Sequence, residues 1–346
     1  MAKKNDPISG VPTNIITGFL GVGKTSAILN LLNNKPENER WAILVNEFGE
    51  IGIDGSIFES QYTEEQGVYI REVPGGCMCC TAGTPMQVAL AQLLRKAKPD
   101  RLLIEPTGLG HPSEVLQTLN NDNFQDILEI QKVITLVDAR QLSDSRYVEH
   151  KTFQQQLAIA DVIVANKKDL YAHDDKLALE SYLHKHSLHN VPLLFTEYGV
   201  IEHEVLNGLK ASKFNQSFDG ITFSLNDKKD TFNEPIPECG YIKAVNKGEG
   251  FASIGWRFSS NKLFDRDQLF SFLSGVKAER LKATFITNDG CFAYNLTQDA
   301  CSEILVEDVD ESRIEIIALN LNNNWEKELF SSISSNDLDI KQSNQS

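Results

Sequence analysis

Residues 18–26 read "GFLGVGKTS". This stretch follows the apolar run "TNIIT" (13–17) and opens the periodic segment "TSAILNLLNN" (25–34). A glycine-rich loop between a strand and a helix, ending in Lys and Thr, matches the pattern G-x-x-x-x-G-K-[ST]. In such loops the backbone N–H groups converge on phosphate oxygens at the N-terminus of the helix. The stretch therefore predicts a P-loop nucleotide-binding domain.

The residues of this loop have separate expected roles. Lys24 should reach the β- and γ-phosphates and stabilise their charge during hydrolysis, so it is also a predicted catalytic residue. The Thr25 hydroxyl should bind Mg²⁺. The residues expected to contact the nucleotide here are Gly18, Gly21, Gly23, Lys24, Thr25 and Ser26.

Short apolar runs continue along the first part of the chain and indicate the fold. Continuous Val, Ile and Leu runs are typical of strands that are buried on both faces. Helical patterns such as 84–97 lie between several of them, and alternation of strand and helix indicates a doubly wound, mostly parallel α/β sheet. The further expected strands are 41–45, 67–73, 101–105, 133–139, 161–166 and 191–195.

The tetrapeptide "NKKD" (166–169) follows one of these runs, where a nucleotide base would lie at the carboxyl edge of the sheet. The Asp169 carboxylate can accept hydrogen bonds from the N1–H and N2–H groups of guanine, whereas adenine presents the wrong pattern. Alone, the tetrapeptide could equally be a solvated turn. In order after the P-loop it favours GTP, with Asn166, Lys167 and Asp169 as binding residues.

Two acidic segments at strand ends are candidates for magnesium binding and for sensing the γ-phosphate. In "RLLIEPTGLGHP" (101–112), Glu105 is expected to hold Mg²⁺ and take part in catalysis, and the N–H of Gly108 is expected to approach the γ-phosphate. In "VNEFGEIGID" (45–54), Glu47, Glu50 and Asp54 suit a switch loop, with Asp54 orienting the attacking water or the metal. Solvated loops are the alternative for both segments.

The segment "GGCMCC" (75–80) holds Cys77, Cys79 and Cys80. A redox pair, a closed structural zinc knuckle and an open metal site are the alternatives. No second C-x-x-C or H-x₃-H partner lies nearby to close a knuckle, which favours the open metal site. Glu50 is the candidate for a further ligand, with His111 behind it.

The remaining candidate metal ligands are weaker. The three histidines of "HKHSLH" (184–189) could form an auxiliary metal-loading face, but a solvent-facing helix is the favoured interpretation. The scattered cysteines Cys239, Cys291 and Cys301 are interpreted as small, partly buried residues.

Composition limits the partners and the compartment. The formal net charge is −15, so the chain offers no basic surface for nucleic acid. The start "MAKKNDPISGVP" is followed by no apolar h-region, and no run is long enough to span a bilayer. We therefore expect a cytoplasmic protein that binds neither nucleic acid nor membrane.

The chain is expected to contain two domains. We assign residues 1–200 to a P-loop GTPase domain with the C-x-C-C motif, 201–238 to a linker, 239–335 to a smaller C-terminal α+β domain and 336–346 to a disordered tail. The "NDG" at 288–290 lies between two alternating runs and predicts a hairpin in the second domain.

The motifs "GFLGVGKT", "NEFGEIGID", "GGCMCC", "EPTGLG" and "NKKD" occur in this order. Together they resemble the CobW-type GTPases, a family of P-loop metallochaperones. The resemblance implies GTP hydrolysis with Mg²⁺, coupled to holding Zn²⁺ at Cys77, Cys79 and Cys80 and to its delivery to client metalloproteins. It leaves the client unnamed and leaves homo-oligomerisation open.

Two other functions remain as alternatives. A regulatory GTP-binding switch with a structural zinc would keep its metal throughout the nucleotide cycle. A P-loop kinase that phosphorylates a small molecule is disfavoured by "NKKD".

Overall fold

The computed structural model describes residues 8–45, 62–73, 84–110, 112–210, 235–248, 250–296, 301–306 and 309–334. The chain divides into two compact units, and the described residues up to 210 belong to the first and those from 235 onward to the second. Within the described residues, no helix has both the length and the apolar character needed to cross a membrane.

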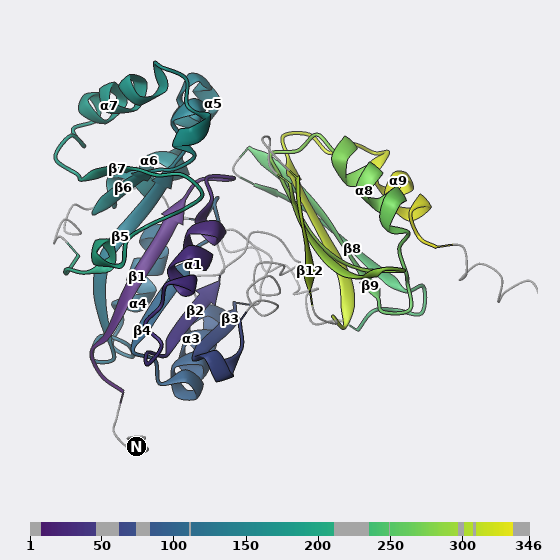
Figure 1. Cartoon of the computed structure of the whole chain (residues 1–346), viewed down its shortest axis with the longest axis horizontal. Coiled ribbons are helices and arrows are strands. Elements are labelled where there is room, and N and C mark those ends of the chain that lie inside the picture. The colour runs from purple at the N-terminus through teal and green to yellow at the C-terminus, as the bar shows by residue number, and fades with distance from the viewer. Residues whose placement is uncertain are drawn as a thin grey trace, which may run out of the picture. The chain divides into compact units, whose positions relative to one another are not determined.

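The first unit is built on a seven-stranded sheet in the order β3-β2-β4-β1-β5-β6-β7 (Figure 1). Every neighbouring pair of strands is parallel. This confirms the predicted α/β fold. The strands are β1 (Val11–Gly18), β2 (Trp41–Val45), β3 (Val68–Glu72), β4 (Arg101–Glu105), β5 (Leu128–Val137), β6 (Val162–Ala165) and β7 (Leu193–Phe195).

Helices connect these strands, as parallel pairing requires. The α-helices are α1 (Lys24–Asn33), α3 (Thr84–Ala97), α4 (Pro112–Leu119), α5 (Ser145–Val148), α6 (Lys151–Ala158) and α7 (Asp175–Lys185). Short 3₁₀ turns lie at η1 (Glu64–Gln66), η2 (Ala139–Ser143), η3 (Lys168–Leu170) and η4 (His203–Leu206). Apolar residues of α3 and α4 pack with Ala42 and Leu44 of β2 in one core cluster.

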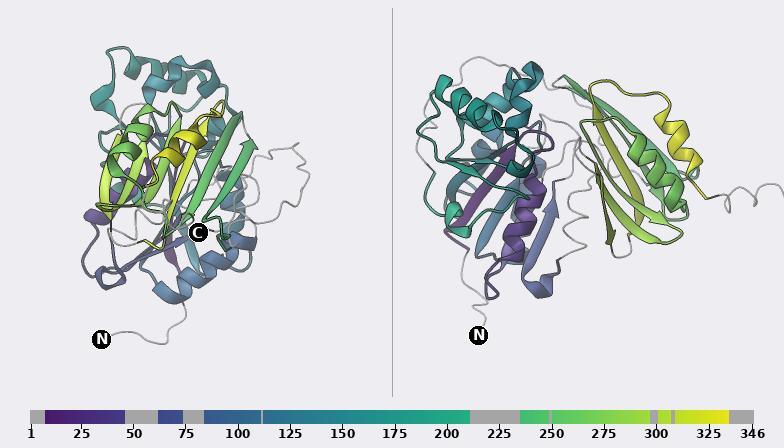
Figure 2. Two further views of the ribbon diagram at one scale, coloured as in Figure 1. Left: turned by 90° about the vertical axis from the view of Figure 1, so that its right-hand side faces the viewer. Right: turned by 45° about the horizontal axis from the view of Figure 1, so that its top comes forward.

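The second unit is a separate, six-stranded antiparallel sheet in the order β12-β11-β10-β13-β9-β8 (Figure 2). Its strands are β8 (Tyr241–Gly248), β9 (Phe251–Ser259), β10 (Arg280–Thr287), β11 (Gly290–Leu296), β12 (Cys301–Val306) and β13 (Glu311–Ala318). Helices α8 (Arg266–Gly275) and α9 (Trp325–Ser331) pack with the sheet around Trp256, Phe258 and Phe285. The expected α+β domain and its hairpin are thus present, with Thr287 paired to Gly290.

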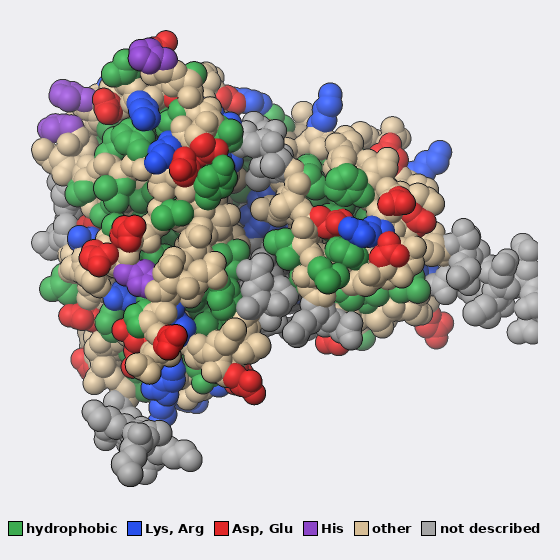
Figure 3. All heavy atoms as spheres, viewed as in Figure 1, with side chains coloured by type: hydrophobic (Ala, Val, Ile, Leu, Met, Phe, Trp, Pro, Cys, Tyr) green, Lys and Arg blue, Asp and Glu red, His purple; other side chains and the backbone are tan. Residues whose placement is uncertain are grey.

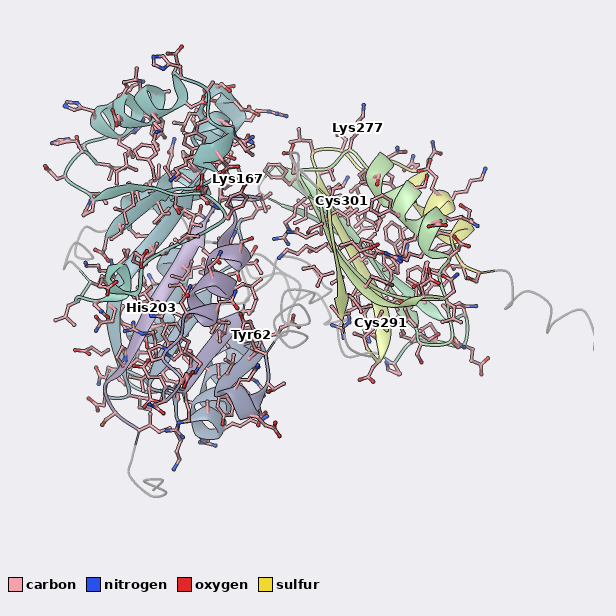
Figure 4. The ribbon with its side chains drawn as sticks, viewed as in Figure 1. Tyr62, Lys167, His203, Lys277, Cys291 and Cys301 are labelled. Carbon is pink, nitrogen blue, oxygen red and sulfur yellow. The ribbon has the colours of Figure 1, made fainter. Side chains whose placement is uncertain are left out.

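The scattered cysteines differ in exposure. Cys291 on β11 is buried, Cys301 on β12 is half-buried and Cys239 is exposed. The first two, labelled in Figure 4, agree with the expectation of small packing residues. Cys239 does not, because it precedes β8 on the surface.

Residues 201–210, assigned to a linker from the sequence, contact β1 and β5 of the first unit. The Asn14 Nδ2 of β1 donates to the carbonyl oxygen of Leu206 at 2.8 Å, and the backbone N–H of Lys132 donates to Gly208 at 3.0 Å. Leu209 also bridges to Gln131 in antiparallel fashion. Residues 211–234 of the expected linker and the expected tail lie outside the described residues, whereas 235–238 are described and precede β8.

Candidate nucleotide-binding site

The predicted nucleotide-binding residues gather at the carboxyl ends of β1, β4 and β6, and Asp138, which was not predicted, follows β5 between them. The P-loop follows β1, residues 106–110 follow β4, Asp138 follows β5 and the "NKKD" segment follows β6. In a parallel sheet these ends lie at one edge, where open α/β folds bind ligands. Figure 4 places Lys167 at this end of β1, away from His203.

The backbone of the P-loop requires glycine. Gly21 and Gly23 have φ angles of +71° and +96°, and Gly23 is the residue before α1. A Cβ atom on Gly18 would lie 2.5 Å from the carbonyl oxygen of Leu136, and one on Gly23 would lie 2.5 Å from the Nδ2 of Asn166. These glycines therefore allow the loop to turn tightly into the N-terminus of α1, the position at which phosphate groups bind in such folds.

The expected magnesium ligands contact each other. The Thr25 Oγ1 donates to the Oε1 of Glu105 at 2.9 Å, and Glu105 is only 2% exposed. A hydroxyl and a carboxylate are the oxygen ligands that Mg²⁺ takes in nucleotide sites, so the chemistry of these two groups fits the ion. Bound there, Mg²⁺ would neutralise charge on the β- and γ-phosphates.

Lys24 lies beside the same contact. Its side chain is 6% exposed, and its Nζ donates to the carbonyl oxygen of Phe19 at 3.1 Å. A Cβ atom on Gly108 would lie 3.1 Å from this Nζ and 2.9 Å from the Cδ2 of Leu20. The loop after β4 thus approaches the P-loop closely, and a larger residue at 108 would require Leu20 and Lys24 to shift.

Asn166 connects three parts of the site. Its buried side chain donates from Nδ2 to the carbonyl oxygen of Val22 at 2.9 Å and accepts at Oδ1 from the N–H of Gly199 at 2.9 Å. The side chain therefore joins the end of β6 to the P-loop and to the loop after β7. This is a structural role that the "NKKD" pattern alone does not reveal.

The other residues of this segment are more open. Lys167 has a φ of +62°, and its Nζ lies 3.8 Å from the Oδ2 of buried Asp138. Asp169 is exposed on η3, so its carboxylate is accessible to a base. Its predicted role in reading guanine stays a prediction.

Two residues that the sequence analysis missed hold this segment. The Tyr171 hydroxyl donates to the carbonyl oxygen of Asn166 at 2.6 Å and accepts from the N–H of Ala139 at 3.0 Å. Burial raises the pKa of Tyr171 well above its ordinary value, so the hydroxyl keeps its proton. Asp138 accepts from the Nε of Arg140 at 3.0 Å.

The loop after β7 was missed as well. Gly199 has a φ of +73°, and a Cβ atom there would lie 2.7 Å from the backbone nitrogen of Ala27. The Asn30 Nδ2 donates to the carbonyl oxygen of Tyr198 at 2.5 Å. The loop thus lies against α1, and a glycine just after the last apolar run was the signal for it.

Residues 12–190 match the family described as "CobW/HypB/UreG, nucleotide-binding domain". The chain belongs to this family. Its first unit is accordingly a P-loop GTPase domain, which confirms the resemblance and the activity predicted from the motifs.

One named relative extends the likeness to both units. The zinc chaperone YeiR of Escherichia coli (strain K12) is 37% identical over 316 residues, which cover 88% of this chain and 92% of the relative. The zinc-regulated GTPase metalloprotein activator 1 of Schizosaccharomyces pombe is 33% identical over 163 residues, which cover 46% of this chain and 39% of the relative. A solved structure, Zn(II)-bound YjiA GTPase from E. coli, is 19% identical with a TM-score of 0.39, and the match covers 95% of this chain and 100% of that chain.

The predicted zinc ligands of this CobW/HypB/UreG protein lie outside the described residues. This holds for the thiols of Cys77, Cys79 and Cys80 and for Glu50, and also for Glu47, Asp54 and His111. Within the described ranges, no group of three or more His, Cys, Asp and Glu residues could hold a metal ion.

The histidines 184, 186 and 189 are exposed at the end of α7 and just beyond it. Figure 3 shows histidine side chains on this part of the surface. The rings of His184 and His189 stack with centroids 4.9 Å apart, and His186 stacks on Tyr182. The arrangement agrees with the favoured interpretation of a solvent-facing helix end.

Proposed function

We propose that this protein is a GTP-hydrolysing zinc metallochaperone. It binds Zn²⁺ at the C-x-C-C motif of Cys77, Cys79 and Cys80, with Glu50 as a further ligand, and couples GTP hydrolysis to transfer of the metal to client metalloproteins. The contact between Thr25 and Glu105 beside Lys24 carries the nucleotide half of this proposal. Family membership and the zinc-chaperone names of the relatives support the metal half.

The chain's own groups supply the hydrolytic site. Lys24 neutralises charge on the γ-phosphate, and the backbone N–H groups of the P-loop and of Gly108 hold the phosphate oxygens. Thr25 and Glu105 would hold the magnesium. Asp54 orients the attacking water, and exposed Asp169 selects guanine.

Strand order supports coupling between the nucleotide and the metal. The last residue of β2, Val45, pairs with Glu72 on β3 and with Glu105 on β4. The strand ends from which the switch segment and the cysteine segment depart are therefore neighbours, next to the strand end that bears Glu105. In this proposal, Glu50 joins the thiolates when γ-phosphate orders the switch, and hydrolysis removes that ligand.

The proposal predicts that Zn²⁺ binds more tightly in the GTP state. The measurement is the Zn²⁺ dissociation constant with GDP and with a non-hydrolysable GTP analogue, at fixed Mg²⁺ and pH. Coupling of the usual size makes the two constants differ by roughly 5- to 150-fold. Glu50→Ala should reduce this factor while leaving GDP binding nearly intact.

Two further results decide between this proposal and the regulatory switch. Cys79→Ser combined with Cys80→Ser should lose the metal, because thiolates provide most of the ligands. Equal dissociation constants in the two nucleotide states would contradict coupling and favour a structural zinc.

The expected partners are client metalloproteins, with no nucleic acid and no membrane, and homo-oligomerisation stays open.

A further inference from the structure

Gln156 is a fully buried glutamine that contacts the loop after β4. It lies on α6 with 0% of its surface exposed, and its Nε2 donates to the carbonyl oxygen of Gly108 at 3.1 Å. A carbonyl oxygen can only accept, so the amide group that faces Gly108 must be the NH₂. The orientation of the side-chain amide therefore follows from its partner.

This hydrogen bond fixes a peptide that would otherwise rotate. The carbonyl of Gly108 belongs to the same peptide unit as the N–H of Leu109, which donates to the Oγ1 of Thr107 at 3.4 Å. Gln156 and Thr107 thus hold the two ends of one peptide unit. Because glycine has the widest backbone freedom, these contacts set the orientation of Gly108.

The orientation matters because of what surrounds Gly108. Its virtual Cβ position lies 3.1 Å from the Lys24 Nζ and 3.1 Å from the backbone nitrogen of Leu20 in the P-loop. A rotation of the Gly108 peptide would therefore alter the side of the phosphate cradle that faces Lys24.

Stability alone does not account for a glutamine at this position. The Oε1 of Gln156 is buried and has no hydrogen-bond partner among the described residues. A buried acceptor without a partner destabilises the fold. Methionine of about the same size would remove this acceptor and leave the Gly108 carbonyl without its donor, so the two effects on stability offset each other. The Thr135 Oγ1 donates to the backbone oxygen of Gln156 at 2.8 Å, so α6 is anchored to β5 independently of the amide.

We propose that Gln156 is a positioning residue for GTP hydrolysis. It acts through the backbone of Gly108. By holding the carbonyl of this residue, Gln156 restricts the ψ angle between that carbonyl and the Gly108 N–H, which belongs to the preceding peptide unit and meets the γ-phosphate in the proposed function. The inference rests on the proposed function, which assigns that N–H to the γ-phosphate.

The test compares Gln156→Met with Gln154→Met in the full chain. Gln154 lies on the same helix and also donates to a backbone carbonyl, that of Val148 at 3.0 Å, but it is exposed. Three quantities are measured: single-turnover GTP hydrolysis, the dissociation constants of GDP and of a non-hydrolysable GTP analogue, and Tm.

For Gln156→Met, hydrolysis should fall about 10- to 100-fold, since a small misplacement of a positioned group can cost that much. The GTP analogue should bind more weakly relative to GDP, and Tm should stay close to that of Gln154→Met. Hydrolysis at the rate of the Gln154→Met control would overturn the proposal. An equal loss of GDP and analogue binding with a lower Tm would also overturn it, because it would indicate a structural role.

Two more variants keep the result interpretable. If Gln156→Met does not fold, Gln156→Glu keeps the volume and presents carboxylate oxygens to the Gly108 carbonyl, and the same selective loss is expected. Wild-type hydrolysis in that variant would overturn the proposal. Gly108→Ala tests the underlying assignment: if it hydrolyses GTP normally, the role of Gly108 in the proposed function is wrong, whereas a defect in Gly108→Ala without one in Gln156→Met refutes the inference alone.

Discussion

Strand β4 carries a charged residue at each end, and the two are used differently. Arg101 at the amino end donates to the Oδ1 of Asn14 at 2.7 Å and to the Oδ1 of Asn207 at 2.9 Å, and it lies over the ring of Trp41. Glu105 at the carboxyl end accepts from the Thr25 hydroxyl beside the P-loop. One charge is surrounded by amides and an aromatic ring, and the other adjoins a loop of glycines.

The surroundings of the two ends extend this difference. At the amino end large side chains fill the space: the rings of Trp41 and His203 are 5.2 Å apart, and the Nε2 of His203 lies 3.0 Å from the carbonyl oxygen of Leu31. At the carboxyl end, a Cβ atom on Gly18 would lie 2.5 Å from the carbonyl oxygen of Leu136, and one on Gly108 would lie 3.1 Å from the backbone nitrogen of Leu20. Large side chains thus fill the space at the amino edge, whereas glycines let the loops approach each other closely at the carboxyl edge.

The largest expected effect tests the carboxyl edge. Asp169→Ala should remove the acceptor for guanine and lower the preference for GTP over ATP by about 10⁴-fold, leaving ATP binding nearly unchanged. Because Asp169 is exposed, Tm should not change. Competition binding of GTP and ATP measures the preference, with the exposed Asp174→Ala as the control. Equal affinity of the wild-type protein for the two nucleotides would refute guanine reading by this residue.

The next effect tests the amino edge. Arg101→Met should lower the free energy of unfolding of the first unit by about 2–3 kcal/mol, the usual worth of hydrogen bonds to a charged group. The hydrolysis rate of the folded protein should remain that of the wild type. Thermal unfolding and single-turnover hydrolysis measure the two quantities, and exposed Arg95→Met is the control. A slow but fully stable Arg101→Met would show that the two edges are not separate in function.

The smallest effect compares one glycine from each edge. Gly10 before β1 has a φ of +63° with nothing within 4 Å of its virtual Cβ, and Gly199 has a φ of +73° with Ala27 in close contact. Alanine at either position should cost about 1–2 kcal/mol because of the left-handed backbone. Gly199→Ala should in addition displace α1 and weaken GTP binding. Isothermal titration with GTP distinguishes the two variants. Equal GTP affinities of Gly10→Ala and Gly199→Ala would contradict the importance of the contact between Gly199 and Ala27.

Most of the fold could be predicted because the strands of the first unit contain short continuous apolar runs. Residues 41–45 are an example: they were expected as a strand and form β2, in which every residue is buried. Strand β12 was not expected from the sequence: it lies at the edge of its sheet, and all of its residues are half-buried or exposed. Such a strand has little hydrophobic pattern to detect.

The site was predictable only where local sequence carries the chemistry. The P-loop and "NKKD" are contiguous motifs, and the structure brings them together through Asn166. Gln156, Tyr171 and Gly199 act through partners at other strand ends, and these contacts depend on the order of the strands in the sheet. No local pattern encodes that order. The predicted metal ligands are still predictions, because they lie outside the described residues.

The segment after β7 sets a limit on how this protein can be shortened. It contacts helix α1 at Ala27, Asn30 and Leu31, and residues 206–210 then pair with β1 and β5. A fragment that ends at residue 190, where the family match stops, would lack β7 and all of these contacts with α1, β1 and β5. The shortest fragment that retains the loop after β7 and its contacts therefore runs to about Lys210. Proteolysis between residues 190 and 210 should abolish nucleotide binding although every sequence motif of the site is still present.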